Sequence, residues 1–374
     1  MRKEEKKSGI EQLNKVLRKA GEIVIYGAGV IAYGAYVVLK EVYGIENLKF
    51  VVTDADERKM IGSAVVKGID EISDSEKKAL FLVATPEVYH TEIKKKLQEK
   101  KIEKVLFLNN KLEFLLMSQY YGKMTEFKVL KSTTIEGYAT TEQPLDENDV
   151  MVCMCQSIYD KKIQTMVVRE KYVKPIHVGR ALCDVSLAPL VDNTGDNISD
   201  KNRIYSELTA TYWLWKNVKS KYKGIFHYRR QLMVPERELQ WCMDNDVDAI
   251  LPLPFVCYPN TEGQYGRYIS KEDREILMRA IQEIVPNEMK TITKILDDKY
   301  LYNYNMLIAK SEVYDEYCEW IFSILFRAEE LRNEIKPGEN DRFAGYFGEV
   351  LTSLFFLKNK DRFKIVHAEK QWYV

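Results

Sequence analysis

Neither charge is in excess along this chain. Lysine and arginine together number 56, as do aspartate and glutamate, so the formal net charge at pH 7 is zero. The sequence-independent part of nucleic-acid binding requires a surplus of basic residues. The lysine-rich stretch at residues 94–101 is short and predicts only a solvated helix face. We therefore expect no nucleic-acid partner.

Long apolar runs are also missing. No stretch reaches the roughly 20 apolar residues that a membrane-spanning helix requires. The N-terminal residues do not follow the pattern of a secretory leader. These features predict a cytoplasmic protein whose contact with a membrane is peripheral, at the inner face of the cytoplasmic membrane.

Metal-binding and disulfide patterns are absent as well. The six cysteines and four histidines follow none of the spacings that zinc sites use. Cys153 and Cys155 form a C-x-C pair within an apolar stretch, which is weak evidence for metal or redox chemistry. We expect reduced thiols and no metal site.

The first 110 residues alternate between apolar runs and amphipathic segments. Strands are expected at residues 22–26, 48–54, 79–84 and 104–108. A helix is expected after the first strand, to about residue 42. This β-α-β alternation predicts a Rossmann-like domain with a parallel sheet over residues 1–126. Residues 127–149 lose the pattern and contain Ser, Thr, Pro and acidic residues, so we interpret them as a linker.

A second α/β series occupies residues 150–374. Its strands are expected at residues 150–154, 175–178, 224–228, 249–251 and 305–309. An amphipathic helix is expected from residue 204 to 216. A later helix carries Glu349 on a face away from its apolar stripe. The chain is thus predicted to be a two-domain α/β protein.

Gly27 and Gly29 follow the first expected strand, and Asp54 closes the second. This order matches the dinucleotide-binding fingerprint, in which glycines let the backbone approach a phosphate and the acid holds ribose hydroxyls. Three interpretations stay open: a dinucleotide, another small nucleotide or sugar, or a tight turn without a ligand. The first would make the chain an NAD(P)-dependent oxidoreductase or epimerase of sugar metabolism. No nearby residue supplies the acid or base of hydride transfer.

The run His227-Tyr228-Arg229-Arg230 ends one strand of the second series. Ligands of α/β sheets bind at strand ends, and two guanidiniums suit a diphosphate or a carboxylate. In extended backbone, His227 and Arg229 would share one face and Arg230 would lie on the other. Alternatively, these cations only hold the domain together by pairing with acids such as Asp196, Asp200 or Glu207.

A polar loop at residues 192–202 precedes the expected helix and is too rich in Asn, Asp and Gly to be helical. Asp196 and Asn197 are candidates for binding sugar or ribose hydroxyls. Glu207, which lies off the apolar stripe of the helix, is a third candidate. Alternatively, Ser199 or Asn202 of this loop only caps the helix.

Several segments occur together in the order of a known family: residues 179–182, 192–202, 205–210, 222–230, 304–306 and 345–351. Residues 150–372 resemble a bacterial galactofuranosyltransferase family of capsule and O-antigen loci, formerly catalogued as an uncharacterised domain. The resemblance implies an A-type, Rossmann-like glycosyltransferase fold. It also implies inverting transfer from UDP-galactofuranose to a growing glycan, for which we expect a lipid-linked acceptor. The N-terminal part resembles small Rossmann-like domains of sugar-modifying enzymes.

The resemblance also implies roles for single residues. A-type enzymes usually hold the donor diphosphate through a metal on an Asp-x-Asp motif. This chain instead has His227, Arg229 and Arg230 at the corresponding strand end. From the charges of these residues, rather than from the resemblance, we expect them to neutralise the diphosphate without a metal or other cofactor. Inversion requires a base, and Glu349 occupies its position, with Asp196 and Asp248 as rivals. Asn305 is expected beneath the donor sugar.

Overall fold

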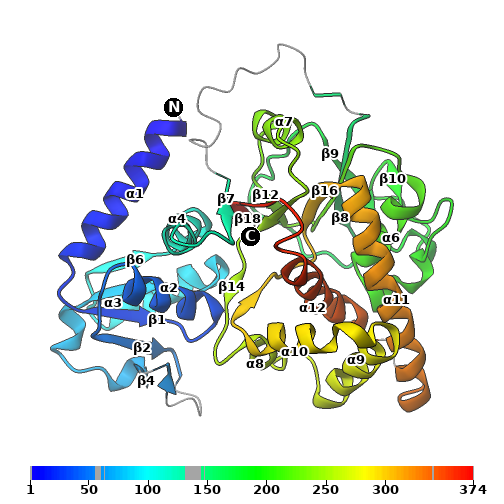
Figure 1. Cartoon of the computed structure of the whole chain (residues 1–374). Coiled ribbons are helices and arrows are strands. Elements are labelled where there is room, and N and C mark those ends of the chain that lie inside the picture. Colours follow the sequence, from blue (N-terminus) through cyan, green and yellow to red (C-terminus); the bar gives the residue numbers. More distant parts are fainter. Residues whose placement is uncertain are drawn as a thin grey trace. The chain divides into compact units, whose positions relative to one another are not determined.

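The computed structural model describes residues 2–54, 60–62, 64–130, 145–146, 148–338 and 341–373. The chain divides into two compact units, coloured along the sequence in Figure 1. The first comprises Met1–Val129 with Phe255–Asn260 and Val374, and the second comprises Leu130–Pro254 and Thr261–Tyr373. Most of the expected linker, residues 131–144 and 147, lies outside the described residues.

The first unit contains a mainly parallel sheet in the order β3-β4-β2-β1-β5-β6. The strands are β1 (Ile23–Tyr26), β2 (Leu48–Val52), β3 (Met60–Ile61), β4 (Ala64–Gly68), β5 (Leu80–Val83) and β6 (Val105–Phe107). Among the described pairs in this order, β3 with β4 is antiparallel and the others are parallel. The helices are α1 (Arg2–Lys19), α2 (Val30–Glu41), α3 (His90–Glu99) and α4 (Asn110–Tyr121). Short strands β7 (Lys128–Val129) and β14 (Phe255–Val256) also belong to this unit.

The four strands expected in the first unit are confirmed, with ends that differ by one or two residues. All residues of β1 are buried, as in a parallel strand that is covered on both faces. Side chains of β1 and β5 pack in one apolar cluster with Ile93 and Leu97 of α3. Strands β3 and β4 were not expected, because their alternation of exposed and buried residues is short.

The sheet of the second unit runs in the order β10-β9-β8-β11-β16-β13-β17. Its strands are β8 (Val150–Gln156), β9 (Val173–His177), β10 (Leu190–Val191), β11 (Tyr222–Phe226), β13 (Ala249–Pro252), β16 (Leu307–Lys310) and β17 (Ile365–Ala368). Strand β16 is antiparallel to both of its neighbours, and the other pairs in this order are parallel. The α/β, Rossmann-like class expected from the sequence is confirmed.

The helices of the second unit are α5 (Asn202–Tyr205), α6 (Leu208–Asn217), α7 (Glu236–Asp244), α8 (Thr261–Tyr265), α9 (Lys271–Ile284), α10 (Met289–Asp297), α11 (Ser311–Ile335) and α12 (Phe343–Lys358). Strand β15 (Tyr300–Leu301) is short, and β12 (Arg230–Leu232) pairs with β18 (Lys370–Trp372) in a two-stranded ribbon. In the described part of the chain, no helix has the length and apolar character needed to cross a membrane.

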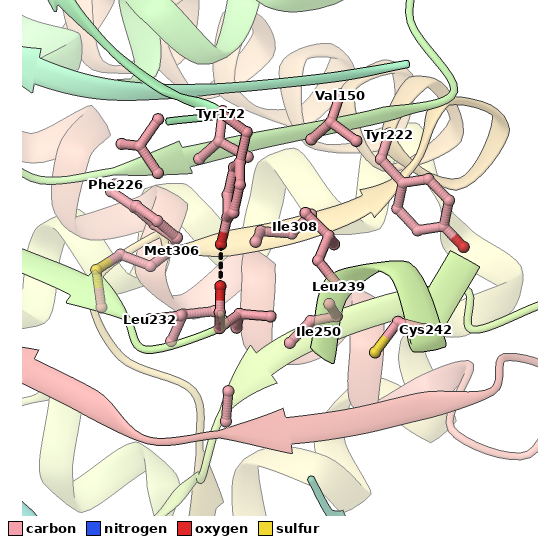
Figure 2. Packing of buried hydrophobic residues seen from close by; sticks show 14 of the residues in the cluster. Val150, Tyr172, Tyr222, Phe226, Leu232, Leu239, Cys242, Ile250, Met306 and Ile308 are labelled. Carbon is pink, nitrogen blue, oxygen red and sulfur yellow. Dashed lines mark hydrogen bonds between the residues drawn. The ribbon is translucent and has the colours of Figure 1, made fainter. Parts of the chain in front are cut away.

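A buried apolar cluster fixes the sheet of the second unit against α7 (Figure 2). Val150, Phe226 and Ile308 come from three adjacent strands, and each is at most 1% exposed. Full burial of such a side chain stabilises the fold by about 1.5–3 kcal/mol. The hydroxyl of Tyr172 donates a hydrogen bond to the carbonyl of Val234, so its polar end is satisfied inside the cluster. The strand ends beside this cluster are therefore rigidly placed.

Candidate functional site

A cavity of about 680 Å³ lies at the carboxyl ends of β8, β9 and β11. Its lining includes side chains that directly follow each of these strands, which is where ligands of α/β sheets bind. The lining residues are Cys155, Ser157, Tyr159, Asp160, Lys161, Val178, Asn202, Arg203, Ser206, Glu207, His227, Tyr228, Arg229, Arg230 and Arg342.

The expected run 227–230 forms a tight turn rather than an extended strand. Strand β11 ends at Phe226. The N–H of His227 then donates to the carbonyl of Arg230 at 3.1 Å, and the N–H of Arg230 donates back at 3.2 Å. The turn is required because the chain reverses to pair β12 with β18. The alternation expected for extended backbone does not apply after the strand ends, and all four residues line the cavity.

Arg230 is held between two aromatic rings. Its guanidinium carbon lies 4.2 Å from the ring centre of Tyr304 and 4.3 Å from that of Trp372, and such contacts stabilise a cation. The buried Nε atoms of Arg229 and Arg230 have no hydrogen-bond partner among the described residues. Burial lowers the pKa of Arg230, yet an arginine stays protonated in proteins. The turn therefore presents two cations with unused donors.

Arg342 is a third cation at the cavity, and the sequence did not reveal it. Its Nε donates to Oγ of Ser206 at 2.9 Å. Ser206 has a φ of 52° and a ψ of −129°, a conformation that costs a non-glycine residue free energy. The expected helix 204–216 is therefore wrong as one element: it breaks at Ser206 into α5 and α6.

The break at Ser206 is supported by the two helix segments and by α12. The side-chain amide of Asn202 donates to the carbonyl of Ser206 at 2.7 Å. A Cβ on Gly348 would lie 2.6 Å from Cδ1 of Leu208, and one on Gly345 would lie 3.3 Å from Oγ of Ser206. These glycines let α12 pack closely against the segment from Ser206 to Leu208. Glu207, which directly follows the break, lines the cavity.

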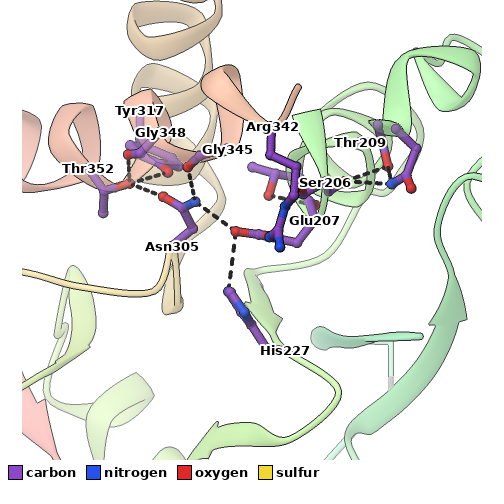
Figure 3. A network of polar contacts seen from close by, with 12 residues as sticks. Ser206, Glu207, Thr209, His227, Asn305, Tyr317, Arg342, Gly345, Gly348 and Thr352 are labelled. Atoms are coloured by element: carbon purple, nitrogen blue, oxygen red, sulfur yellow. Dashed lines mark hydrogen bonds and ion pairs between the residues drawn. The ribbon is translucent and has the colours of Figure 1, made fainter. Parts of the chain in front are cut away.

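Glu207 lies at the centre of a polar network (Figure 3). Nδ2 of Asn305 donates to its Oε1 at 2.8 Å, and Nε2 of His227 lies 3.4 Å from the same oxygen. Burial lowers the pKa of His227, while the charge of Glu207 opposes this shift. Glu207 is thus fixed in position and contacts the turn 227–230.

Asn305 orients Glu207 and does not line the cavity. It is 1% exposed, and its amide also donates to the carbonyl of Gly345 at 3.1 Å. Its Oδ1 accepts from Oγ1 of Thr352 at 3.2 Å. The φ of Asn305 is 45°, a left-handed value. Because its hydrogen bonds are used within the protein, the expected contact of Asn305 with a sugar hydroxyl is not supported by its position.

Two further acids have raised pKa values. Burial raises the pKa of Glu349 on α12 to about 8, the charge of Glu207 adds to the shift, and Arg230 and Arg342 oppose it. Burial raises the pKa of Asp160 to about 6, although its Oδ2 accepts from the N–H of Ser157 at 2.7 Å. Asp160 follows β8 and was not singled out in the sequence. Asp160 lines the cavity, whereas Glu349 is not among its lining residues and interacts electrostatically with three that are, Glu207, Arg230 and Arg342. Carboxyl groups with perturbed pKa values are typical of functional sites.

The structure does not bring Asp196, Asn197 or Asp248 to the cavity. Asp196 is exposed and accepts from the hydroxyl of Tyr212 at 3.1 Å. The side-chain amide of Asn197 donates to the carbonyl of Gly195 at 2.9 Å. Asp248 precedes β13 at its amino end and accepts from Lys310 at 2.9 Å. These three residues stabilise loops and ion pairs instead.

The N-terminal glycines have different surroundings. The φ of Gly27 is 123°, and a Cβ there would lie 2.8 Å from the carbonyl oxygen of Ala84, so the backbone requires glycine. Gly29 precedes α2 and has open space where a Cβ would point. Asp54 is exposed at the end of the described segment that follows β2. Within the described ranges, no three His, Cys, Asp or Glu side chains are grouped to hold a metal ion.

A family model described as a domain of unknown function, DUF4422, matches residues 156–360. The match covers more than half of the 374 residues and includes the whole cavity lining except Cys155. The chain belongs to the DUF4422 family. This match confirms the predicted membership of a family catalogued as an uncharacterised domain. No curated protein sequence matches the chain.

The fold of this DUF4422 protein is similar to that of a solved structure, the bifunctional glycosyltransferase WbbM in its apo form. The TM-score is 0.53 and the sequence identity is 24%. The similarity covers 60% of this chain and 45% of the WbbM chain, so the chain spans less than half of the length of that protein. At this identity the similarity establishes the fold.

Proposed function

We propose that this protein is a glycosyltransferase that transfers galactofuranose from UDP-galactofuranose, with inversion, to a growing cell-surface glycan. Two findings support the transferase class: membership of DUF4422 and a fold similar to that of WbbM. The donor sugar and the inversion are inferred from the resemblance of residues 150–372 to galactofuranosyltransferases of capsule and O-antigen loci. The acceptor is proposed to be lipid-linked.

The observation that carries the proposal is the cluster of arginines at the strand ends. Arg229, Arg230 and Arg342 line one cavity, and two of them keep buried Nε donors without a partner among the described residues. A departing nucleoside diphosphate is multiply anionic, and each charge-assisted hydrogen bond contributes about 1.5–3 kcal/mol. Fixed cations of this kind stabilise charge as it develops on the leaving group. We therefore assign the diphosphate to this cluster.

Glu349 is proposed as the base. The acceptor hydroxyl attacks C1 of the sugar, Glu349 takes its proton, and the bond between C1 and the diphosphate oxygen breaks. A pKa of about 8 makes Glu349 a stronger base than an ordinary glutamate. About one Glu349 in ten is ionised at pH 7, so turnover is expected to rise as the pH increases toward 8. The charge of Glu207 contributes to the raised pKa of Glu349, and a hydrogen bond from Asn305 holds Glu207 in place.

The test combines donor binding with turnover. UDP should raise the melting temperature of the full chain, and UDP-galactofuranose should be consumed in the presence of an acceptor glycan. Glu349→Gln should abolish transfer and retain UDP binding, whereas Glu330→Gln, at an exposed position on α11, should change neither. Transfer by Glu349→Gln near the normal rate would remove Glu349 from this role. Absence of any UDP binding would refute the proposed function.

A further inference from the structure

The connection between β8 and β9 exposes several large apolar side chains. Residues 157–172 contain neither helix nor strand, and this loop is longer than the median of about 4–6 residues. The exposed fractions are 83% for Met166, 65% for Tyr159, 53% for Val168 and 45% for Ile158. Single exposed apolar residues are ordinary, but a group of them marks an interaction surface.

Hydrogen bonds and apolar packing anchor the backbone of this loop. The carbonyl of Val168 accepts from Nε2 of Gln231 at 2.5 Å and from the hydroxyl of Tyr373 at 3.0 Å. The side chain of Val167 packs against the buried cluster of the second unit. The exposed side chains therefore project from an anchored backbone.

A second loop extends the same surface. Val185 is 63% exposed and Leu187 is 43% exposed, between β9 and β10. Leu187 lines an open hollow of about 310 Å³ together with Ile163 and Val167 of the first loop. The hollow shares Ser157, Asp160, Lys161 and Tyr228 with the main cavity. The apolar surface therefore borders the proposed active site.

Basic residues occur in the same loop as these apolar residues. Lys161, Lys162, Arg169 and Lys171 are exposed, and none forms an ion pair with a described residue. Among the acids of the two loops, Asp184 is exposed, whereas Asp160 and Glu170 are half-buried. Apolar groups mixed with unpaired cations match the interface of an anionic bilayer, where the former insert and the latter bind headgroups.

We propose that residues 158–171 and 185–187 form a docking surface for an anionic lipid bilayer. Docking would bring the mouth of the cavity to the level of the headgroups, where a lipid-linked acceptor presents its sugar. The delivery of a lipid-linked acceptor to the cavity rests on the proposed function, whereas binding of the protein to a bilayer does not. It can be measured without donor or acceptor, so its failure is distinguishable from failure of the transferase proposal.

The test is cosedimentation of the full chain with vesicles of phosphatidylcholine alone or mixed with phosphatidylglycerol. We expect binding to the anionic vesicles that weakens at high salt. Each basic residue near an anionic surface contributes about fivefold in affinity. Lys162→Glu with Lys171→Glu should therefore weaken binding by roughly 25-fold or more. Met166→Ser with Val185→Ser should also weaken it by at least about tenfold, since buried apolar area is removed.

The matched control is Ile284→Ser with Ile335→Ser, which removes exposed apolar side chains from α9 and α11. This variant should bind vesicles normally. None of the substituted positions lines the main cavity. An unchanged melting temperature without any ligand verifies the fold of every variant. Equal binding of zwitterionic vesicles, equal loss in the control, or no binding of anionic vesicles would overturn the proposal. Self-association that Met166→Ser with Val185→Ser abolishes, without bilayer binding, would identify a second copy as the partner and also overturn it.

Discussion

Replacement of Arg230 by methionine tests the proposed diphosphate site most directly. The substitution removes a charge but keeps an apolar chain between the rings of Tyr304 and Trp372. Loss of one charge-assisted hydrogen bond costs about 1.5–3 kcal/mol, which corresponds to a roughly ten- to hundredfold weaker affinity for UDP. The fold should tolerate the change, because removal of a buried charge offsets the absence of the two cation–π interactions.

The same substitution has a second, independent effect on Glu349. The positive charge of Arg230 lowers the pKa of Glu349, so its removal should raise that pKa above about 8. The rise of turnover with pH should therefore shift to higher pH in Arg230→Met. Titration calorimetry with UDP and a pH profile of transfer measure the two effects. The idea that Arg230 is a diphosphate ligand would be refuted by UDP affinity within twofold of normal in a folded variant.

A matched arginine serves as the control for this experiment. The guanidinium carbon of Arg362 lies 4.2 Å from the ring centre of Phe363, and its side chain also pairs with Glu316. Arg362 does not line the cavity. Arg362→Met also removes a cation–π contact, so it should leave UDP affinity and the pH profile unchanged. A similar loss of affinity in both variants would indicate a general effect of charge on the protein.

Two further predictions concern stability. Gly348→Ala should destabilise the second unit by about 1–3 kcal/mol in thermal melts, because the new methyl group would lie 2.6 Å from Leu208 and 3.2 Å from Asn305. Gly9→Ala in α1 is the control. Its methyl group would have its nearest neighbour at an ordinary 3.4 Å, so this substitution should be neutral or stabilising. In the first unit, hydrogen bonds from Ser73 hold the pKa of Glu76 well below its usual range. A lowered folded-state pKa contributes stability above the unfolded pKa of about 4.3 that is lost as the pH falls. Glu76→Gln should reduce this acid dependence in denaturant titrations, and an unchanged dependence would contradict the assignment.

The strands that were predicted from the sequence are short apolar runs with polar residues at both ends. Val150, Phe226 and Ile308 belong to such runs and are buried as that pattern requires. The position of Glu349 on a late helix followed from the family resemblance and from helical periodicity. The charged groups that act on Glu349 could not be predicted in this way, since Glu207 and Arg230 come from distant segments of the sequence.

Other parts of the site depend on contacts that no local pattern encodes. Arg342 meets Ser206 across 136 residues of sequence, and periodicity carries no information about such a pair. The break at Ser206 arises because α12 packs against it, whereas the residues from 204 to 216 have an uninterrupted helical pattern. Asp160 was accessible to sequence reasoning, because it lies in a polar segment directly after a strand, as His227 does.

The charges at the cavity link donor binding to the protonation of Glu349. Arg230 and Arg342 hold the pKa of Glu349 down against burial and Glu207. A bound diphosphate offsets those cations, so Glu349 should bind its proton more tightly in the UDP complex. UDP binding should then take up protons near pH 8 and little at pH 6, where Glu349 is already protonated. By linkage, UDP affinity should fall as the pH rises through about 8.

Calorimetry in two buffers of different ionisation enthalpy measures the proton uptake on UDP binding, which Glu349→Gln should abolish. Proton release at pH 8, or uptake that survives the substitution, would contradict the coupling, because Glu349 is the group whose pKa the arginines hold down.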